Sequence, residues 1–239
     1  MTVKIIACEV MKEELLAITP HEQVEYEFIS MGLHLHPQKL HNELQNILHR
    51  STGYNKVVLA FGLCGGAARD LKAADSPLII PRVHDCIAIL LGSKQAYERY
   101  SREERGTFYL TCGWMITEKN ILSEHRRICD TYGEKKARSI LARMYDSYKK
   151  VLFIKTGCST LDVCLQQSLE IAALLNLSHH IMTGDNTYLQ KIVNGPWDEA
   201  DFIHVPPLQI VKEEHFMQGE IANKDKTNNE KQGGLLDVN

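Results

Sequence analysis

The sequence lacks long hydrophobic runs and a large charge of one sign. Its longest apolar stretches, such as residues 86–92, fall far short of the roughly 18–20 residues that a membrane-spanning helix needs. The net charge is only -3 over 239 residues, which argues against a broad electrostatic surface for nucleic acid or anionic lipid. We therefore expect no membrane span and no nucleic-acid partner.

Familiar phosphate-binding motifs are also missing, and the start of the chain is expected to be a strand rather than a signal peptide. The segment Gly62-Leu-Cys-Gly-Gly66 does not match the dinucleotide pattern G-x-G-x-x-G, and no G-x-x-x-x-G-K-[ST] motif occurs. The apolar start of the chain is interrupted at once by Glu9 and Lys12, so it predicts a first strand. Seven cysteines lie mostly in strand-turn-helix contexts, which favours free or metal-bound thiols in the cytoplasm.

The remaining pattern is that of an α/β protein. Hydrophobic residues make up 44% and charged residues 24%, as in globular proteins. Apolar, β-branched runs alternate with helical patterns, which predicts a mostly parallel, Rossmann-like sheet with helices on both faces. Strands are expected at 3–8, 24–30, 55–63, 77–82, 106–111, 150–156, 179–183 and 201–205. Helices are expected at 11–18, 37–50, 66–74, 85–104, 121–149 (broken near Gly133), 159–176 and 186–194.

The domain organisation follows from the same pattern. Residues 1–212 are expected to form a single α/β domain, with two lobes, about 1–120 and 121–212, as the alternative. A strand, a cysteine and a helix recur at 3–18, 55–74 and 151–176, as duplicated α/β units would produce. Residues 213–239 include the polar run 223–234, which has no apolar side chain, and predict a disordered tail.

Cysteine and histidine residues follow several of these strands. The carboxyl ends of parallel strands share one edge of a sheet, so residues just past them can converge. Thiolates and imidazole suit zinc, iron or an iron–sulfur cluster, and a catalytic zinc ion takes about three protein ligands with one position open. We therefore predict a metal site, with zinc first, whose ligands are Cys64, His84, Cys86 and Cys158.

Five further residues near these positions are predicted to contact a cofactor or substrate: Cys8, Gly62, Gly65, Arg82 and Asp185. The glycines permit close approach and positive φ. Arg82 can clamp a carboxylate or pair with Asp85, and Asp185 can contact a ligand or cap a helix.

Other candidates carry weaker signals. Cysteine is often a small buried hydrophobe, so Cys129 and Cys164, which lie in predicted helices, are assigned to the core. Cys112 follows another strand and can join the metal ligands. The spacing of His34 and His36 suits either a metal or a solvated loop pair.

Several segments together resemble an uncharacterised family, domain of unknown function sixteen thirty-eight, over about residues 3–207. They are Phe61-Gly-Leu-Cys-Gly-Gly66, Pro77-Leu-Ile-Ile-Pro-Arg-Val-His-Asp-Cys-Ile-Ala-Ile-Leu-Leu-Gly-Ser93, Gly106-Thr-Phe-Tyr-Leu-Thr111 and Gly195-Pro-Trp-Asp198. Members occur chiefly in methanogens and other anaerobes, often encoded near corrinoid-dependent methyltransferases. The resemblance implies anaerobic one-carbon metabolism.

His84-Asp-Cys86 with a later cysteine is also similar to the zinc site of enzymes that move methyl groups from corrinoid proteins to thiols. In those enzymes the metal binds the acceptor thiol and stabilises its thiolate.

Three functions remain open at this point. The first is a zinc-dependent, methyltransferase-type enzyme that acts on a thiol or a small methyl donor. The second is a non-catalytic accessory protein that binds a metal or docks on a corrinoid protein or methyltransferase. The third is an iron–sulfur protein that uses Cys8, Cys64 and Cys158.

Overall fold

The computed structural model describes residues 2–117 and 120–217. The strands are β1 (Thr2–Cys8), β2 (Gln23–Ile29), β3 (Lys56–Ala60), β4 (Leu78–Pro81), β5 (Thr107–Leu110), β6 (Lys150–Lys155), β7 (Ser178–Thr183) and β8 (Phe202–Val205). The α-helices are α1 (Lys12–Leu16), α2 (Pro37–Arg50), α3 (Cys86–Leu90), α4 (Lys94–Glu103), α5 (Cys112–Met115), α6 (Ile121–Tyr132), α7 (Glu134–Met144), α8 (Leu161–Leu175), α9 (Thr187–Asn194) and α10 (Glu214–Met217). Three 3₁₀ turns are η1 (Glu9–Met11), η2 (Met31–Leu35) and η3 (Cys64–Gly66).

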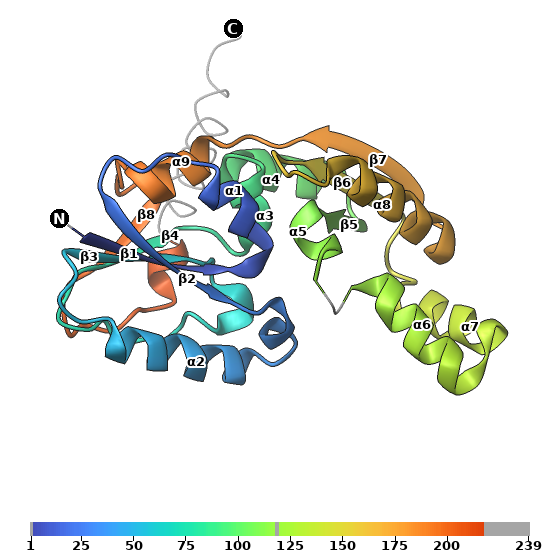
Figure 1. Ribbon diagram of the computed structural model, residues 1–239, viewed down its shortest axis with the longest axis horizontal. Helices are drawn as coiled ribbons and strands as arrows, with labels where there is room; N and C mark the ends of the chain where they lie inside the picture. Colours follow the sequence, from blue (N-terminus) through green and yellow to red (C-terminus); the bar gives the residue numbers. More distant parts are fainter. Residues whose placement is uncertain (1, 118–119, 218–239) are drawn as a thin grey trace, which may run out of the picture.

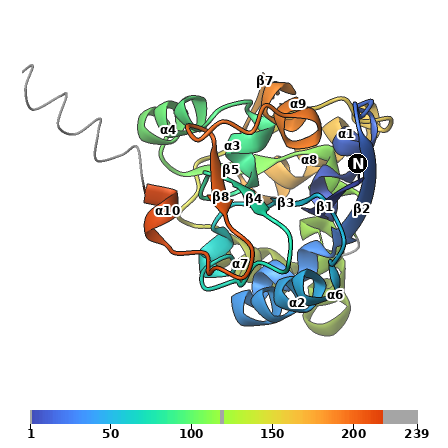
Figure 2. The same cartoon turned by 90° about the vertical axis from the view of Figure 1, so that its left-hand side faces the viewer.

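The first sheet has the strand order β2-β1-β3-β4-β8. The first four strands are parallel, and β8 runs antiparallel to β4 at the edge, as Figure 2 shows. Helix α2 covers one face, and α1, α3 and α9 lie on the other (Figure 1). Because β1, β3 and β4 are buried on both faces, they are almost continuously apolar in sequence.

The second sheet is smaller and entirely parallel, with the order β5-β6-β7. Its strands lie between β4 and β8 in the chain, which then returns to the first sheet (Figure 1). Val151 and Phe153 of β6 pack in a core with residues of α7 and α8. Ile154 packs instead against Ile87 and Leu91, so α3 and the residue after it contact both sheets.

The segment after Cys8 joins the two sheets. A Cβ atom on Gly113 in α5 would lie 1.8 Å from the carbonyl oxygen of Val10, so α5 packs directly on the backbone of η1. Glu14 accepts a hydrogen bond from the Thr156 hydroxyl, and Glu13 Oε2 accepts one from the Ser159 backbone N–H at 3.1 Å. These contacts hold the turn after β6 against α1.

The expected α/β class with mostly parallel strands is confirmed, and a strand is found at each predicted place. The helix expected at 66–74 is wrong. Gly65 and Gly66 both adopt positive φ, and the chain beyond them bonds to a distant segment, with Asp70 N donating to Val211 O at 2.9 Å. The 85–104 pattern forms two helices that break at Gly92, and the 121–149 pattern breaks at Gly133 as predicted.

The predicted tail is ordered at its start. Glu214–Met217 form α10, where Phe216 is only 1% exposed and the carbonyl of His215 accepts a hydrogen bond from Arg82. The rest of that tail, 218–239, lies outside the described residues. Within the described ranges, no helix combines the length and apolarity needed to cross a bilayer.

Candidate functional site

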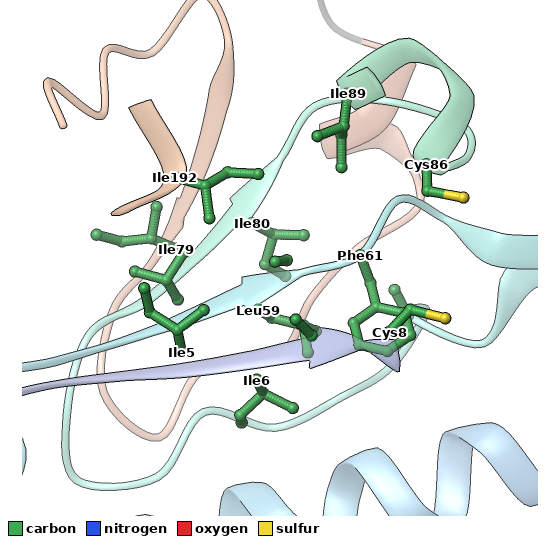
Figure 3. Packing of buried hydrophobic residues seen from close by; sticks show 14 of the residues in the cluster. Ile5, Ile6, Cys8, Leu59, Phe61, Ile79, Ile80, Cys86, Ile89 and Ile192 are labelled. Atoms are coloured by element: carbon green, nitrogen blue, oxygen red, sulfur yellow. The ribbon is translucent and has the colours of Figure 1, made fainter. Parts of the chain in front are cut away.

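Three free cysteines lie at the carboxyl ends of three neighbouring parallel strands. We call Cys8, Cys64 and Cys86 the first sulfur group. Cys8 ends β1, Cys64 follows β3 in η3, and Cys86 begins α3 after β4. Figure 3 shows Cys8, Phe61 and Cys86 at the same end of the sheet. The sequence predicted such a convergence at one sheet edge, but with Cys158 included, and Cys158 follows a strand of the other sheet.

Backbone contacts lock the two loops that carry Cys64 and Cys86. Cys64 N donates to the carbonyl oxygen of His84 at 2.9 Å, and Leu63 N donates to that of Val83 at 3.0 Å. A Cβ atom on Gly62 would lie 2.7 Å from the backbone of residues 83–85, so only glycine allows this approach. Gly62 therefore positions the loops.

Cys64 itself has a strained backbone. Its φ of 47° lies in the left-handed region, which costs a non-glycine residue about 1–2 kcal/mol. Gly65 and Gly66 continue the turn with φ of 67° and 92°. Such strain persists where the surrounding structure enforces it, and it is frequent at functional sites.

The thiols of the first sulfur group resist ionisation. Burial raises the pKa of Cys8 to about 12 and that of Cys64 to about 12, and it raises the pKa of Cys86 well above its ordinary value. The charge of Cys8 further raises the pKa of both other thiols, so the three lie within electrostatic range of one another. A bound cation would remove this penalty and favour the thiolates.

A histidine lies at the same sheet edge, after β2. The Nε2 atom of His34 is buried and has no hydrogen-bond partner among the described residues. Its ring stacks on Phe61 at 5.8 Å between centroids, and burial lowers the pKa of the imidazole. A neutral imidazole with a free ring nitrogen can act as a metal ligand. His36, by contrast, is exposed at the start of α2.

A second sulfur group lies at the carboxyl edge of the second sheet. Cys112, after β5, forms a disulfide with Cys158, after β6, and Cys164 in α8 lies beside them. The three Sγ atoms all lie within 4.8 Å of one another. Cys112 and Cys164 are 1% exposed, whereas Cys158 is half-buried. Burial raises the pKa of the Cys164 thiol.

A cavity of about 330 Å³ opens beside the second sulfur group. Cys164 lines it together with polar side chains from α6, α8 and the segment before α6, among them Asn120, Arg126 and Gln167. The second sulfur group therefore has room for a small ligand next to one of its sulfur atoms.

A third group of ligand atoms occurs at the α6–α7 junction. Cys129 Sγ lies 3.2 Å from His125 Nε2 and 3.0 Å from Glu134 Oε2. The hydrogen bond to Glu134 raises the pKa of Cys129 to about 11. Arg138 Nε donates to the other oxygen of Glu134 at 2.6 Å, so this partly exposed cluster is already well bonded.

The structure does not gather the four predicted metal ligands at one centre. Cys158 follows β6 in the second sheet, whereas Cys64 and Cys86 follow strands of the first sheet. His84 is exposed and, among the described residues, belongs to no cluster of three ligand atoms within 4.8 Å. Cys8, expected at the cofactor, joins Cys64 and Cys86 instead.

Arg82 and Asp185 have local bonding roles. Arg82 Nη2 donates to the carbonyl oxygens of Glu199 at 3.0 Å and Phe202 at 3.1 Å, so it tethers the chain around β8. Asp185 accepts a hydrogen bond from Thr187 N at 2.7 Å, as a helix cap does, and its contact with a ligand stays a prediction. Asp85 likewise caps α3 through Ile87 N.

Sequence reasoning missed the part that Cys164 plays. Its burial in the core was predicted correctly, but its place beside Cys112 and Cys158 was not. A usable signal existed, because Cys164 lies in the first turn of the helix that follows the Cys158 turn. Cys129 was assigned to the core; it is half-buried, packs against the core beside the second sheet and also contacts His125 and Glu134.

Comparison with known proteins gives one finding. No curated protein and no solved structure matches the chain. One protein-family model matches residues 28–193, well over half of the sequence, and this range includes all of both sulfur groups except Cys8. The match confirms the resemblance seen in the sequence motifs. The chain belongs to the family described as protein of unknown function DUF1638.

Proposed function

We propose that this protein binds a sulfur-ligated metal centre, an iron–sulfur cluster, through Cys8, Cys64 and Cys86. The observation that carries the proposal is the convergence of three free thiols from the ends of three adjacent parallel strands. Each is held by strand, turn or helix backbone, as a preorganised ligand must be. Their raised pKa values mean that apolar surroundings and mutual repulsion disfavour the thiolates until a cation compensates.

We favour a cluster over a single ion because the three sulfur atoms are not gathered as closely as the ligands of one tetrahedral ion. Zinc with Zn–S bonds of about 2.3 Å in tetrahedral geometry places its sulfur ligands about 3.8 Å apart. The sulfur atoms of Cys8, Cys64 and Cys86 do not all lie within 4.8 Å of one another. Thiolates bound to different irons of a cluster are spaced more widely. Zinc, the first choice from sequence, becomes the second candidate here.

Two features support an open coordination position. Three cysteines leave one iron of a four-iron cluster without a cysteine ligand, and His34 is available at the same edge. A cavity of about 400 Å³ borders the Cys64 turn at Gly65 and Gly66 and includes His41. We propose that a small polar molecule binds there, next to the centre.

We further propose that the metal centre has a role in methyl metabolism. The support for this role is the family resemblance alone, which implies one-carbon metabolism beside corrinoid-dependent methyltransferases. On this proposal the metal centre serves one-carbon metabolism of anaerobes, with a corrinoid protein or a methyltransferase as partner. Co-purification with such a partner tests it separately from metal binding.

The metal centre is tested by anaerobic purification and reconstitution with ferrous iron and sulfide. The wild-type protein should bind iron and acid-labile sulfide and absorb broadly in the visible range. Cys64→Ser, at the least buried of the three positions, should lower bound iron by about tenfold or more, since even outer-shell changes cost 10–100-fold in metal affinity. Cys164→Ser, which removes a thiol of the second sulfur group, is the matched control and should keep its iron.

Full iron and sulfide in Cys64→Ser would contradict the proposed ligands. A colourless wild-type protein that holds one zinc ion, and loses it in Cys64→Ser, would keep the site but replace the cluster by zinc.

A further inference from the structure

We propose that the second sulfur group is a redox-switched site for a single soft divalent metal ion. In the oxidised state Cys112 and Cys158 are joined by the disulfide. In the reduced state the same two sulfur atoms and Cys164 supply three thiolates to one ion. The proposal concerns residues outside the first sulfur group and does not depend on the function proposed above.

The geometry of the second sulfur group suits one ion. All three Sγ atoms lie within 4.8 Å of one another, so once the disulfide opens they need to spread only to the roughly 3.8 Å spacing of sulfur ligands around tetrahedral zinc. The ligands come from three separate elements, namely the start of α5, the turn after β6 and the first turn of α8. Small side-chain rotations that follow opening of the disulfide can therefore bring three thiolates around a common centre.

The two states exclude each other because they use the same sulfur atoms. A dithiol reductant breaks the Cys112–Cys158 bond, the protein gains two S–H groups, and the reductant becomes a cyclic disulfide. Binding of a divalent ion by Cys112, Cys158 and Cys164 then releases three protons. While the disulfide is intact, only Cys164 can offer a thiolate, and one thiolate does not hold the ion.

The structure leaves room for a reductant to reach the disulfide and for a fourth ligand to reach the bound ion. Cys158 is the half-buried member of the disulfide, and a Cβ atom on the neighbouring Gly157 would meet nothing within 4 Å. A reductant can therefore reach the Cys158 sulfur first. Cys164 lines the cavity of about 330 Å³, so water or a small molecule in that cavity can occupy the fourth position of a three-thiolate ion.

A cobalt(II) titration before and after reduction tests the proposal. Protein is handled anaerobically, reduced with dithiothreitol and freed of reductant, and Co²⁺ is added while the sulfur-to-cobalt charge-transfer absorption is recorded. Reduction should add one bound equivalent of Co²⁺, and dissociation should follow when an added disulfide oxidant accepts the two electrons and the Cys112–Cys158 bond forms again. The difference between the two states isolates the second sulfur group, because the other two ligand groups contain no disulfide.

Two variants decide the assignment. Cys164→Ser should still form the Cys112–Cys158 disulfide, which mass spectrometry verifies, but should lose the extra equivalent. Cys129→Ser removes a thiol at the α6–α7 junction and should keep it. Cys64→Ser should also keep the extra equivalent of Co²⁺, even though that variant is expected to lose iron from the first sulfur group. The proposal is overturned if reduction adds no cobalt to the wild-type protein, or if Cys164→Ser gains as much as the wild type.

Discussion

The two sulfur groups occupy equivalent places in two different sheets, yet they differ in chemistry. In the first sulfur group three strands of one sheet present thiols that stay free and do not form a group of sulfur atoms within 4.8 Å of one another. In the second sulfur group two strand ends and a helix bring three sulfur atoms within 4.8 Å, close enough for a disulfide. Neighbouring strands have the same spacing in both sheets, so the turns that follow the strands decide how closely the cysteines approach.

The two groups are also mechanically linked. The segment from Cys8 to Glu14 ends with the carboxylates that bond the Cys158 turn, and its η1 backbone contacts α5, which begins at Cys112. A mutation at the contact between η1 and α5 should therefore affect both sulfur groups. A mutation inside one group should affect only that group.

The largest effect is expected from Gly113→Ala. The new methyl group would overlap the backbone of Val10, and flexible side chains cannot relieve a backbone clash. We expect a loss of about 3 kcal/mol or more in the free energy of unfolding, measured by urea denaturation. Gly157→Ala, beside Cys158 but with open space around it, is the matched control and should stay within about 0.5 kcal/mol of wild type. Equal stability of the two variants would show that the contact between η1 and α5 is absent in solution.

A smaller and more local effect is expected from Gly62→Ala. Its methyl group would push the Cys64 loop away from residues 83–85, at a cost of about 1–3 kcal/mol. No ligand is removed, but the spacing between Cys64 and Cys86 changes, so reconstituted iron should fall. The Cys112–Cys158 disulfide should form as in wild type, as thiol counting under denaturing conditions can show. Loss of the disulfide together with the iron would mean that the two groups do not respond separately.

The smallest effect is expected from Glu14→Gln. Burial raises the pKa of Glu14 above its unfolded value of 4.5, so the folded protein holds this proton to higher pH than the unfolded chain. Wild-type stability therefore falls as pH rises from 4.5 through the folded pKa, and it stays lower above that. Glutamine keeps an acceptor for the Thr156 hydroxyl and cannot ionise. The variant should be more stable than wild type at pH 8, by about 1 kcal/mol or less, and equal to it below pH 4.

Urea denaturation at both pH values checks this sign. A variant that is less stable than wild type at pH 8 would mean that the charged carboxylate stabilises the contact between α1 and the Cys158 turn.

Local patterns in the sequence were enough to predict the strands and the cysteines at their ends. Cys8, Cys64 and Cys86 each follow an apolar run whose burial on both faces identifies a central parallel strand. The pattern could not reveal that β5, β6 and β7 form a separate sheet, because strand pairing depends on long-range contacts. For that reason Cys158 was grouped with the wrong partners.

The misassigned residues have a common physical cause. Arg82 was expected to bind a ligand, but backbone carbonyls of a segment more than 100 positions away use its donors. The 66–74 segment has helical composition, yet hydrogen bonds to the chain near Val211 hold it in turns and a single β-bridge at Lys72. In both cases a distant segment satisfies polar groups that local sequence leaves unassigned.

The most direct test of this account is a crystal structure of anaerobically reconstituted protein, with anomalous scattering recorded at the iron and zinc edges. The account predicts an iron peak within bonding distance of the Cys8, Cys64 and Cys86 sulfur atoms, and none at the second sulfur group while its disulfide is intact. An iron peak at Cys158, or three first-group thiols that contact no metal, would contradict it.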